Sequence, residues 1–397
     1  MANSYSNFFQ SKYFKIYLSV VFISSVLLLS DKFLHPTDWT TSEWLINYQG
    51  GFVRRGFLGE ILYQINNWIN MPIRYLVFYF EIILIFVFLF LTYKFLYDIK
   101  LNELLIFIFF SPIFLIYPVA ENEVLARKEY LFFSIYLVYL NLLISNNRII
   151  YIFNIFALPI MNFVWDGIIF YIFFFLFSFL YKKNLNRKEL ILFFLSIIPY
   201  IVSLYFVINA KSNPIGFEQM CRSLNENCFG AMFALDKSLI WNINYVKTRF
   251  ENIYLLRYFF VIIICFSPIL LLSFYEKKKL IIENLSIYNS KFLMYLISIF
   301  LILIFMFIGF DWGRWINIGY IMSVFTLCFF IKNENINFEQ NVFFKKIKTI
   351  SINYPILFYL SFFIYIFSWN MKATMTDDIG SIPYYRIFTK IIKLFAG

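Results

Sequence analysis

Histidine and cysteine are scarce in this chain of 397 residues, which contains one His and four Cys. So few imidazole and thiol groups exclude a histidine-rich metal centre, a haem held by two histidines and an ordinary Cys/His nucleophile. No glycine begins a Gly-Lys-Ser/Thr sequence, so a P-loop is excluded as well. The chemistry of any active site must therefore come from other side chains.

Charge and chain-breaking residues are also sparse. Only 14% of the residues are charged, and there are 12 Gly and 10 Pro, whereas 61% are hydrophobic and 24% aromatic. This composition excludes an ordinary soluble domain and is typical of a polytopic membrane protein. No cleavable signal-peptide pattern precedes the first apolar stretch, Ile16–Leu29, so we expect an uncleaved first span.

Apolar runs of about 17–25 residues recur along the chain and predict a single all-α transmembrane helical bundle. We place about eleven spans, at 14–31, 73–97, 102–119, 130–146, 149–164, 168–181, 190–209, 253–274, 292–310, 316–332 and 351–369. We expect residues 1–397 to form one integral membrane domain. A first external loop is expected at 32–72 and a long external loop at 210–252.

Lysine and arginine are distributed differently between the two sides of the predicted bundle. With a cytoplasmic N-terminus, 15 of the 23 lysines fall in cytoplasmic connections, as membrane topology favours, whereas nine of the 11 arginines fall outside. The guanidinium group is planar, bidentate and permanently charged, so its concentration on one face suggests a bound anion, with phosphate the first candidate. The alternative is that these arginines form structural salt bridges with nearby acids.

Four short segments rich in charge and tryptophan interrupt the apolar runs, and all four fall on the external side. They are Trp39–Glu60, Glu121–Glu129, Trp165–Asp166 and Asp311–Trp315. Charged residues at the edge of the hydrocarbon region are candidates for functional residues. In the second segment, Glu123 and Arg127 are four residues apart and would share a helix face if that turn is helical.

The first external loop contains two further features. Glycines flank Arg54 and Arg55 and would let the backbone approach a ligand that both arginines could bind. Apolar residues at helical spacing from Phe57 to Trp68 predict an amphipathic helix along the membrane interface. The tryptophans of this loop are expected to act as interface anchors; they are Trp39, Trp44 and Trp68.

Carboxylates beside arginines suggest glycosyl transfer. A carboxylate at a dry site can take the proton of an attacking sugar hydroxyl while a phosphate or diphosphate leaves. The predicted catalytic residues are Asp38, Glu43, Asp166 and Asp311; the predicted phosphate-binding residues are Arg54, Arg55, Arg127, Lys128 and Arg314; and the supporting residues are Glu60, Glu123, Glu129, Trp312 and Trp315. No cofactor or metal ligand is assigned, although two or three of the acids could converge on a divalent cation.

The four cysteines separate into two pairs. Cys265 and Cys328 lie in predicted spans and are expected to be packing residues. Cys221 and Cys228 lie in the long external loop, where an oxidising compartment would allow a disulfide.

The layout of the chain resembles the C-type superfamily of integral membrane glycosyltransferases. It also resembles the polytopic polymerases of bacterial O-antigen and capsule synthesis. Two strings, Gly50-Gly51-Phe52-Val53-Arg54-Arg55-Gly56 and Asp311-Trp312-Gly313-Arg314-Trp315, look like those of uncharacterised bacterial membrane proteins associated with surface polysaccharides. The resemblance covers the layout of most of the chain but only about thirty residues of motif.

The resemblance implies a multi-pass protein of the bacterial inner membrane with its active site facing the periplasm. Its expected partners are a polyprenyl-phosphate-linked sugar or oligosaccharide, membrane lipid and other polysaccharide-assembly proteins, and no nucleic acid. An acid of the first external loop is the expected base in C-type enzymes, which here corresponds to Asp38 or Glu43. Adjacent acids are missing from that loop, a large soluble C-terminal domain is missing too, and loop 210–252 is smaller than expected for a polymerase.

A transporter or flippase for a polyprenyl-linked or other anionic substrate is the alternative function. A transporter predicts inverted repeats, broken helices and polar residues near the bilayer midplane, whereas an enzyme predicts charge gathered at one face. The sequence shows no internal repeat, and its charges gather at one face.

Overall fold

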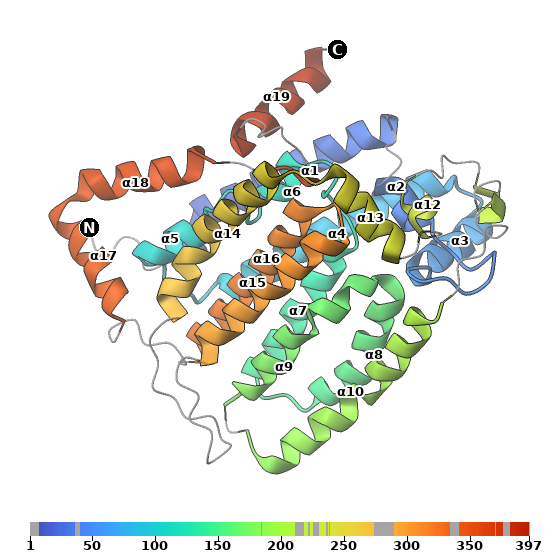
Figure 1. The fold of residues 1–397 in the computed structure, drawn as a ribbon, viewed down its shortest axis with the longest axis horizontal. Helices are drawn as coiled ribbons and strands as arrows, with labels where there is room; N and C mark the ends of the chain where they lie inside the picture. The colour runs from blue at the N-terminus through green and yellow to red at the C-terminus, as the bar shows by residue number, and fades with distance from the viewer. Residues whose placement is uncertain are drawn as a thin grey trace.

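The computed structural model describes residues 8–35, 40–183, 185–210, 218–220, 223–224, 230–235, 237, 239–273, 290–333, 341–369, 371–375 and 382–396. Within these residues the secondary structure is entirely helical, without a β-strand (Figure 1). The α-helices are α1 (Lys12–Leu34), α2 (Thr40–Leu45), α3 (Phe57–Ile69), α4 (Ile73–Leu96), α5 (Glu103–Phe109), α6 (Tyr117–Ala120), α7 (Glu129–Ile144), α8 (Ile149–Val164), α9 (Ile172–Leu180), α10 (Arg187–Ile208), α12 (Ala231–Leu235), α13 (Leu239–Arg249), α14 (Asn252–Ser273), α15 (Ser290–Ile308), α16 (Trp312–Lys332), α17 (Val342–Asn353), α18 (Pro355–Phe367) and α19 (Pro383–Ala396). Two short 3-10 helices are η1 (Phe8–Gln10) and η2 (Asp166–Phe170).

Among the described residues, six helices are long and apolar enough to cross a bilayer, namely α1, α4, α10, α14, α15 and α16. A rise of about 1.5 Å per residue makes helices of this length match a hydrocarbon layer of about 30 Å. A seventh span results if α17 and α18 are counted together. The helices therefore support the prediction of a multi-pass membrane protein.

Helix α16 lies at the centre of the bundle, and its residues from Trp312 to Phe330 are all buried. It packs against α7, α9, α14 and α15, and Figure 1 shows it among these helices. Gly319 allows the close contact with α15, because a Cβ there would lie 2.4 Å from Ile302 Cδ1. Because α16 is enclosed on all sides, the charged turn at its N-terminal end is held in a fixed position.

Three predicted spans are not single straight helices. The 102–119 segment forms α5 and α6 separated by turns, because Pro112 and Pro118 cannot continue a helix. The 351–369 segment begins in α17 and continues in α18, which is bent from α17 by 114° at Tyr354, the residue before Pro355. The 168–181 segment is η2 followed by the nine-residue helix α9.

Helices α7 and α8 correspond to the predicted spans 130–146 and 149–164 but contain 16 residues each. At about 1.5 Å per residue, each is roughly 24 Å long, shorter than the hydrocarbon layer. Helix α8 packs closely on α10, and the amide groups of Asn154 and Asn162 donate hydrogen bonds to Ser196 Oγ (3.0 Å) and Ser203 Oγ (2.7 Å). Because α7 and α8 are this short, they are not counted as spans, and the described residues contain six or seven spans by length and composition.

Several helices end at the same side of the bundle. The C-terminal ends of α1 and α8 and the N-terminal ends of α7 and α16 meet there, beside α2 and α3 (Figure 1). Gly59 lets α3 approach the chain after α2, since a Cβ would lie 1.8 Å from the Ile46 carbonyl oxygen. A helix is thus present in the stretch predicted to be amphipathic, as α3, and it packs on the chain that follows α2.

Candidate functional site

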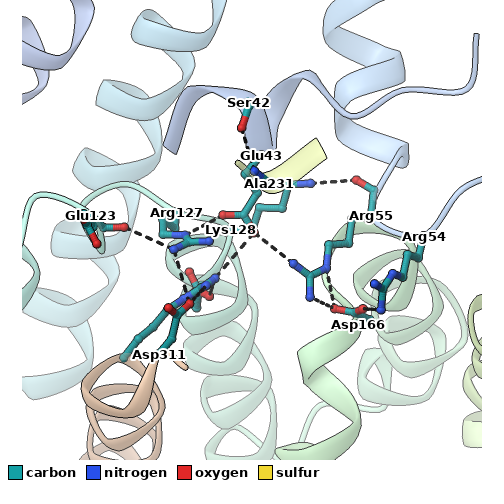
Figure 2. A network of polar contacts seen from close by, with 12 residues as sticks. Ser42, Glu43, Arg54, Arg55, Glu123, Arg127, Lys128, Asp166, Ala231 and Asp311 are labelled. Carbon is teal, nitrogen blue, oxygen red and sulfur yellow. Dashed lines mark hydrogen bonds and ion pairs between the residues drawn. The ribbon is translucent and has the colours of Figure 1, made fainter. Parts of the chain in front are cut away.

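Nine charged side chains from five separate segments meet at this end of the bundle (Figure 2). We call them the charged cluster: Glu43, Arg54, Arg55, Arg127, Lys128, Glu129, Asp166, Asp311 and Arg314. Three of the four charged segments that interrupt the apolar runs contribute most of its members, and Asp166 of the remaining segment completes it. Residues far apart in the sequence thus form one site.

Glu43, in α2, is the centre of the charged cluster. Its Oε2 accepts a hydrogen bond of 2.6 Å from Arg127 Nε, and its Oε1 lies 3.6 Å from Arg314 Nη2 and 3.9 Å from Arg55 Nη1. Three guanidinium groups therefore surround one carboxylate. The side chain is fully buried, so no water compensates for a lost partner.

Arg314, in the first turn of α16, binds three carboxylates. It pairs with Glu129 at the start of α7, its Nη1 donates a 2.9 Å hydrogen bond to Asp311 Oδ2, and it reaches Glu43. Asp311 also lies 3.8 Å from Arg127 Nη1. These ion pairs join the N-terminal ends of α7 and α16 to α2.

Arg54 and Arg55 both bind Asp166. Arg55 Nε and Nη2 lie 2.7 Å and 2.6 Å from Asp166 Oδ1, and Arg54 Nη1 lies 3.3 Å from Oδ2. This arrangement resembles the way arginines hold a phosphate, with the carboxylate of the protein in the place of the anion. The loop that contains the two arginines is therefore attached to η2 through Asp166.

Lys128 connects the two parts of the charged cluster. Its ammonium group donates a 2.8 Å hydrogen bond to the Arg55 carbonyl oxygen and lies 5.8 Å from the centre of the Trp44 ring. The Trp44 indole in turn donates to the Ala126 carbonyl oxygen at 3.2 Å. Arg55 and Ala126 both adopt left-handed backbone conformations, with φ of +66° and +58°. Non-glycine residues pay about 1–3 kcal/mol for such conformations, which cluster at functional sites.

Exposure divides the charged cluster into two halves. The side chains of Glu43, Arg127, Lys128, Glu129 and Arg314 are only 0–7% exposed. Those of Arg54, Arg55, Asp166 and Asp311 are 18–33% exposed. The first five form a buried scaffold, and the last four are the groups that a ligand can reach.

The pKa values reflect this environment. Burial raises the pKa of the Glu43 carboxyl, but Arg127, Arg314, Lys128 and Arg55 outweigh it and hold the pKa well below its usual range. Burial likewise raises the pKa of Asp166, and its two arginines reverse the shift, so the net pKa is lowered. Burial lowers the pKa of Lys128 to about 8, against the attraction of Glu43. Glu43 and Asp166 are therefore weak bases.

The remaining predicted site residues lie around the charged cluster. Glu60 accepts hydrogen bonds from the Tyr48 amide (2.9 Å) and Gln64 Nε2 (2.6 Å), and thus stabilises the connection between α2 and α3. The Trp312 indole donates to the Met306 carbonyl oxygen at 2.7 Å and packs in the core. Trp315 lies under the Arg314 guanidinium, 5.2 Å from it, and stacks on Phe305.

Asp38, Cys221 and Cys228 lie outside the described residues, so the catalytic and disulfide predictions for them stay predictions. Cys265 and Cys328 are buried and free, as expected for packing residues.

One local prediction is wrong. Trp44 is completely buried in the protein and is not an interface anchor, because its indole holds the Ala126 turn. Trp68, by contrast, is 86% exposed. The condition for Glu123 and Arg127 to share a helix face is not met, because this stretch is not an α-helix. Arg127 Nη1 donates to the Glu123 backbone oxygen at 3.4 Å, and Arg127 Nε donates to Glu43.

Sequence reasoning missed two contributors to the site. Lys32, at the end of α1, is buried and donates a 3.3 Å hydrogen bond to the Leu125 carbonyl oxygen. A charge at the end of a span is a signal that could have identified it. Ser42 Oγ accepts a 3.2 Å hydrogen bond from the Ala231 amide, which joins α12 to α2. Nothing in the sequence indicates that contact.

Arginine side chains separate the carboxylates of the charged cluster from one another (Figure 2). In the described part of the chain, no group of three or more His, Cys, Asp or Glu side chains is arranged to hold a metal ion.

Comparison of the chain with models of known protein families, with curated proteins and with solved structures finds no match in any of the three.

Proposed function

We propose that this protein is an inner-membrane glycosyltransferase of surface-polysaccharide assembly, acting on O-antigen or capsule precursors. It would transfer or polymerise sugar units from a polyprenyl-phosphate or polyprenyl-diphosphate carrier at the periplasmic face. The observation that supports this proposal is the charged cluster, in which a buried ionic scaffold holds two arginines and two carboxylates within reach of a ligand.

Arg54 and Arg55 would bind the phosphate of the donor. They already hold an anionic group, Asp166, with Arg55 on one carboxylate oxygen and Arg54 on the other, and both arginines are partly exposed. A phosphate would displace Asp166 or share the two guanidinium groups with it. The nine groups of the charged cluster comprise five cations and four carboxylates, an excess of one positive charge. A phosphodiester carries one negative charge and would neutralise that excess.

Asp311 would orient the acceptor hydroxyl and take its proton. Of the two exposed carboxylates it makes the fewer close ion pairs, since Arg314 is at 2.9 Å and Arg127 only at 3.8 Å, whereas Asp166 is held tightly by two arginines. The acceptor oxygen would form a bond to the anomeric carbon of the donor sugar. The bond from that carbon to the phosphate oxygen would break, and the phosphate would leave with the bonding electron pair.

Glu43, Arg127, Glu129 and Arg314 would position these groups and would not touch the substrate. Their side chains are at most 7% exposed, and Glu43 is a weak base. We therefore assign Glu43 a positioning role in place of the role of catalytic base that the sequence suggested. Asp38 remains the other candidate from the first external loop.

The proposal includes a topology of about eleven spans with a cytoplasmic N-terminus. The shorter helices α7 and α8 and the broken segments 102–119 and 168–181 would cross the membrane in addition to the longer helices. Helix α3 would lie at the periplasmic interface, where its exposed Trp68 meets lipid headgroups.

A transfer assay with purified protein tests the proposal. The protein would be incubated with polyprenyl-phosphate-linked and polyprenyl-diphosphate-linked sugars and an acceptor saccharide, and product would be separated by size. We expect Asp311→Asn to reduce the rate at least 100-fold, because a general base contributes about 10²–10⁴-fold. Asp31→Asn, the same change at an exposed site outside the charged cluster, should retain full activity. Wild-type rates in both variants would contradict the role of Asp311.

The flippase alternative is favoured by one feature of the fold. Discontinuous helices such as α17–α18 and the interrupted 102–119 segment are common in transporters. Purified protein that moves a fluorescent polyprenyl-linked sugar across vesicles, without forming a glycosidic product, would establish the transporter.

A further inference from the structure

The C-terminal segment of the chain contacts both charged loops from outside the charged cluster. We define it as Met371–Met375 together with α19 (Pro383–Ala396). The Ala373 carbonyl oxygen accepts hydrogen bonds from the backbone amides of Gly313 (3.0 Å) and Arg314 (3.4 Å). These amides lie in the first turn of α16, where a backbone N–H group has no acceptor within the helix. On the other side, the Ala373 amide donates a 3.2 Å hydrogen bond to Glu121 Oε2. One residue thus bridges the loop of Asp311 and Arg314 to the loop of Arg127 and Lys128.

The close fit of this bridge depends on Gly313. A Cβ at position 313 would lie 1.9 Å from the Lys372 carbonyl oxygen and 2.5 Å from Tyr117 Oη. The Met375 amide also donates to the Phe310 carbonyl oxygen at 2.9 Å, and Tyr258 Oη donates to the Thr374 carbonyl oxygen at 2.7 Å. The segment 371–375 is therefore held along its length against the turn that contains Asp311.

Helix α19 holds the same loop through two basic side chains. Arg386, which is 8% exposed, pairs with Glu121, and Lys390 Nζ donates to the Ala120 carbonyl oxygen (2.7 Å) and Asn122 Oδ1 (3.0 Å). Both residues face the protein, one turn apart. Lys393, by contrast, is exposed.

The opposite face of α19 is apolar and uncovered. Tyr385, Phe388, Ile392 and Phe395 recur at helical spacing and are 46–76% exposed. Two of the three basic side chains of α19 thus point inward while its large apolar side chains point outward, which is the reverse of the polarity expected in water. The helix packs beside α1, whose Ile16, Val20 and Ile23 are each more than half exposed. Helix α1 is long and apolar enough to span the bilayer, and a span of that kind exposes such side chains to lipid.

We propose that the C-terminal segment is a lipid-anchored brace for the charged cluster. The apolar face of α19 lies against the acyl chains of the bilayer, and its basic face, with the Ala373 bridge, holds the two charged loops at a fixed separation. This inference concerns structure and lipid contact, and it holds whether or not the charged cluster binds a phosphate.

Spin labels test the lipid contact in the full-length protein, reconstituted in vesicles of phosphatidylethanolamine and phosphatidylglycerol. Cys221→Ser and Cys228→Ser remove the two cysteines of the external loop, and the buried Cys265 and Cys328 stay in place. A label at Phe388→Cys is compared with one at Val20→Cys in α1 and one at Ser145→Cys in the exposed turn after α7. We expect the label at 388 to resemble that at 20, with high accessibility to oxygen and low accessibility to a nickel chelate. If the label at 388 has the accessibility of the label at 145, α19 faces water and the proposal is overturned. If the label at 388 is shielded from both oxygen and the nickel chelate, a second protein surface covers α19, and the proposal is overturned as well.

Hydrogen exchange tests the brace. Arg386→Met should accelerate exchange in peptides that contain the Gly313 and Arg314 amides at least tenfold, because the loop bridged by Ala373 loses its attachment to α19. Arg386→Lys should restore most of the protection, and Lys393→Met, a change of the same kind at an exposed position of the same helix, should leave the exchange within twofold of the wild type. Unchanged exchange in Arg386→Met would overturn the bracing role.

Discussion

Replacing Glu43 by glutamine is the most direct test of the buried scaffold. The substitution keeps the shape of the side chain and removes its charge, which leaves Arg127, Arg314 and Arg55 around a neutral group. Glu43 is fully buried, with Arg127 Nε at 2.6 Å and the other two guanidinium groups within 4 Å. Removing one partner of a buried ion pair costs about 3–5 kcal/mol because the remaining charge is left uncompensated.

The expected consequence is a lower melting temperature of the purified protein in detergent. A loss of that size corresponds to a decrease on the order of 4–6 °C for a chain of this length, measured as the loss of the monodisperse peak in size-exclusion chromatography after heating. Asp31→Asn removes a carboxylate whose partner, His35, is exposed, and should change the melting temperature by less than about 2 °C.

A double-substitution cycle separates the ion pair from other effects of the change. In Glu43→Gln/Arg127→Met, the loss of the second charge should recover part of the stability, so the double variant should be less destabilised than the sum of the two single variants. Additive losses, or a melting temperature for Glu43→Gln equal to that of the wild type, would refute the reasoning that this carboxylate balances a buried positive charge.

Three further predictions concern the accessible half of the charged cluster and its surroundings. Arg55→Lys replaces the two guanidinium nitrogens that contact Asp166 Oδ1 by a single ammonium group. It should raise the donor KM at least tenfold, since a charge-assisted hydrogen bond contributes about 1.5–3 kcal/mol, whereas an unchanged KM would remove Arg55 from the phosphate site. The pKa of Lys128 is lowered from 10.5 to about 8, so its positive charge is lost as the pH rises through about 8. The donor KM should therefore increase above that pH in the wild type and stay flat in Lys128→Arg. Between pH 8 and pH 10.5, Lys128 is protonated in the unfolded state but largely neutral in the folded state. The contribution of Lys128 to the unfolding free energy should therefore rise with pH between these two values. Gly313→Ala should lower the melting temperature more than Gly309→Ala, because the added Cβ would meet the Lys372 carbonyl oxygen at 1.9 Å in the first case and Trp315 Nε1 at 3.3 Å in the second; equal effects would contradict the close packing at Gly313.

Most of the helices could be predicted from the sequence, since hydrocarbon thickness and apolar run length are local properties of the chain. The positions of α1, α4, α10, α14, α15 and α16 agree with predicted spans to within a few residues. The interruptions at Pro112 and Pro355 depend on two residues that the hydropathy of a long window does not resolve, although their physical effect is known.

The candidate site, too, could be predicted from the sequence only in part. The sequence by itself determined that charge and tryptophan concentrate in four segments at the ends of apolar runs, because few positions in a membrane protein tolerate an ionised group. It could not show that Glu43 is surrounded by three arginines or that Trp44 is buried. It could not show that Asp166 occupies the bidentate position between Arg54 and Arg55.

Those arrangements were decided only by the tertiary structure. Contacts between residues 43 and 314, or 55 and 166, depend on how helices far apart in the sequence pack around α16, and on which carboxylate reaches which guanidinium once water is excluded. The sequence specifies the charges and their number, whereas burial and distance determine which of them form a scaffold and which remain accessible to a ligand.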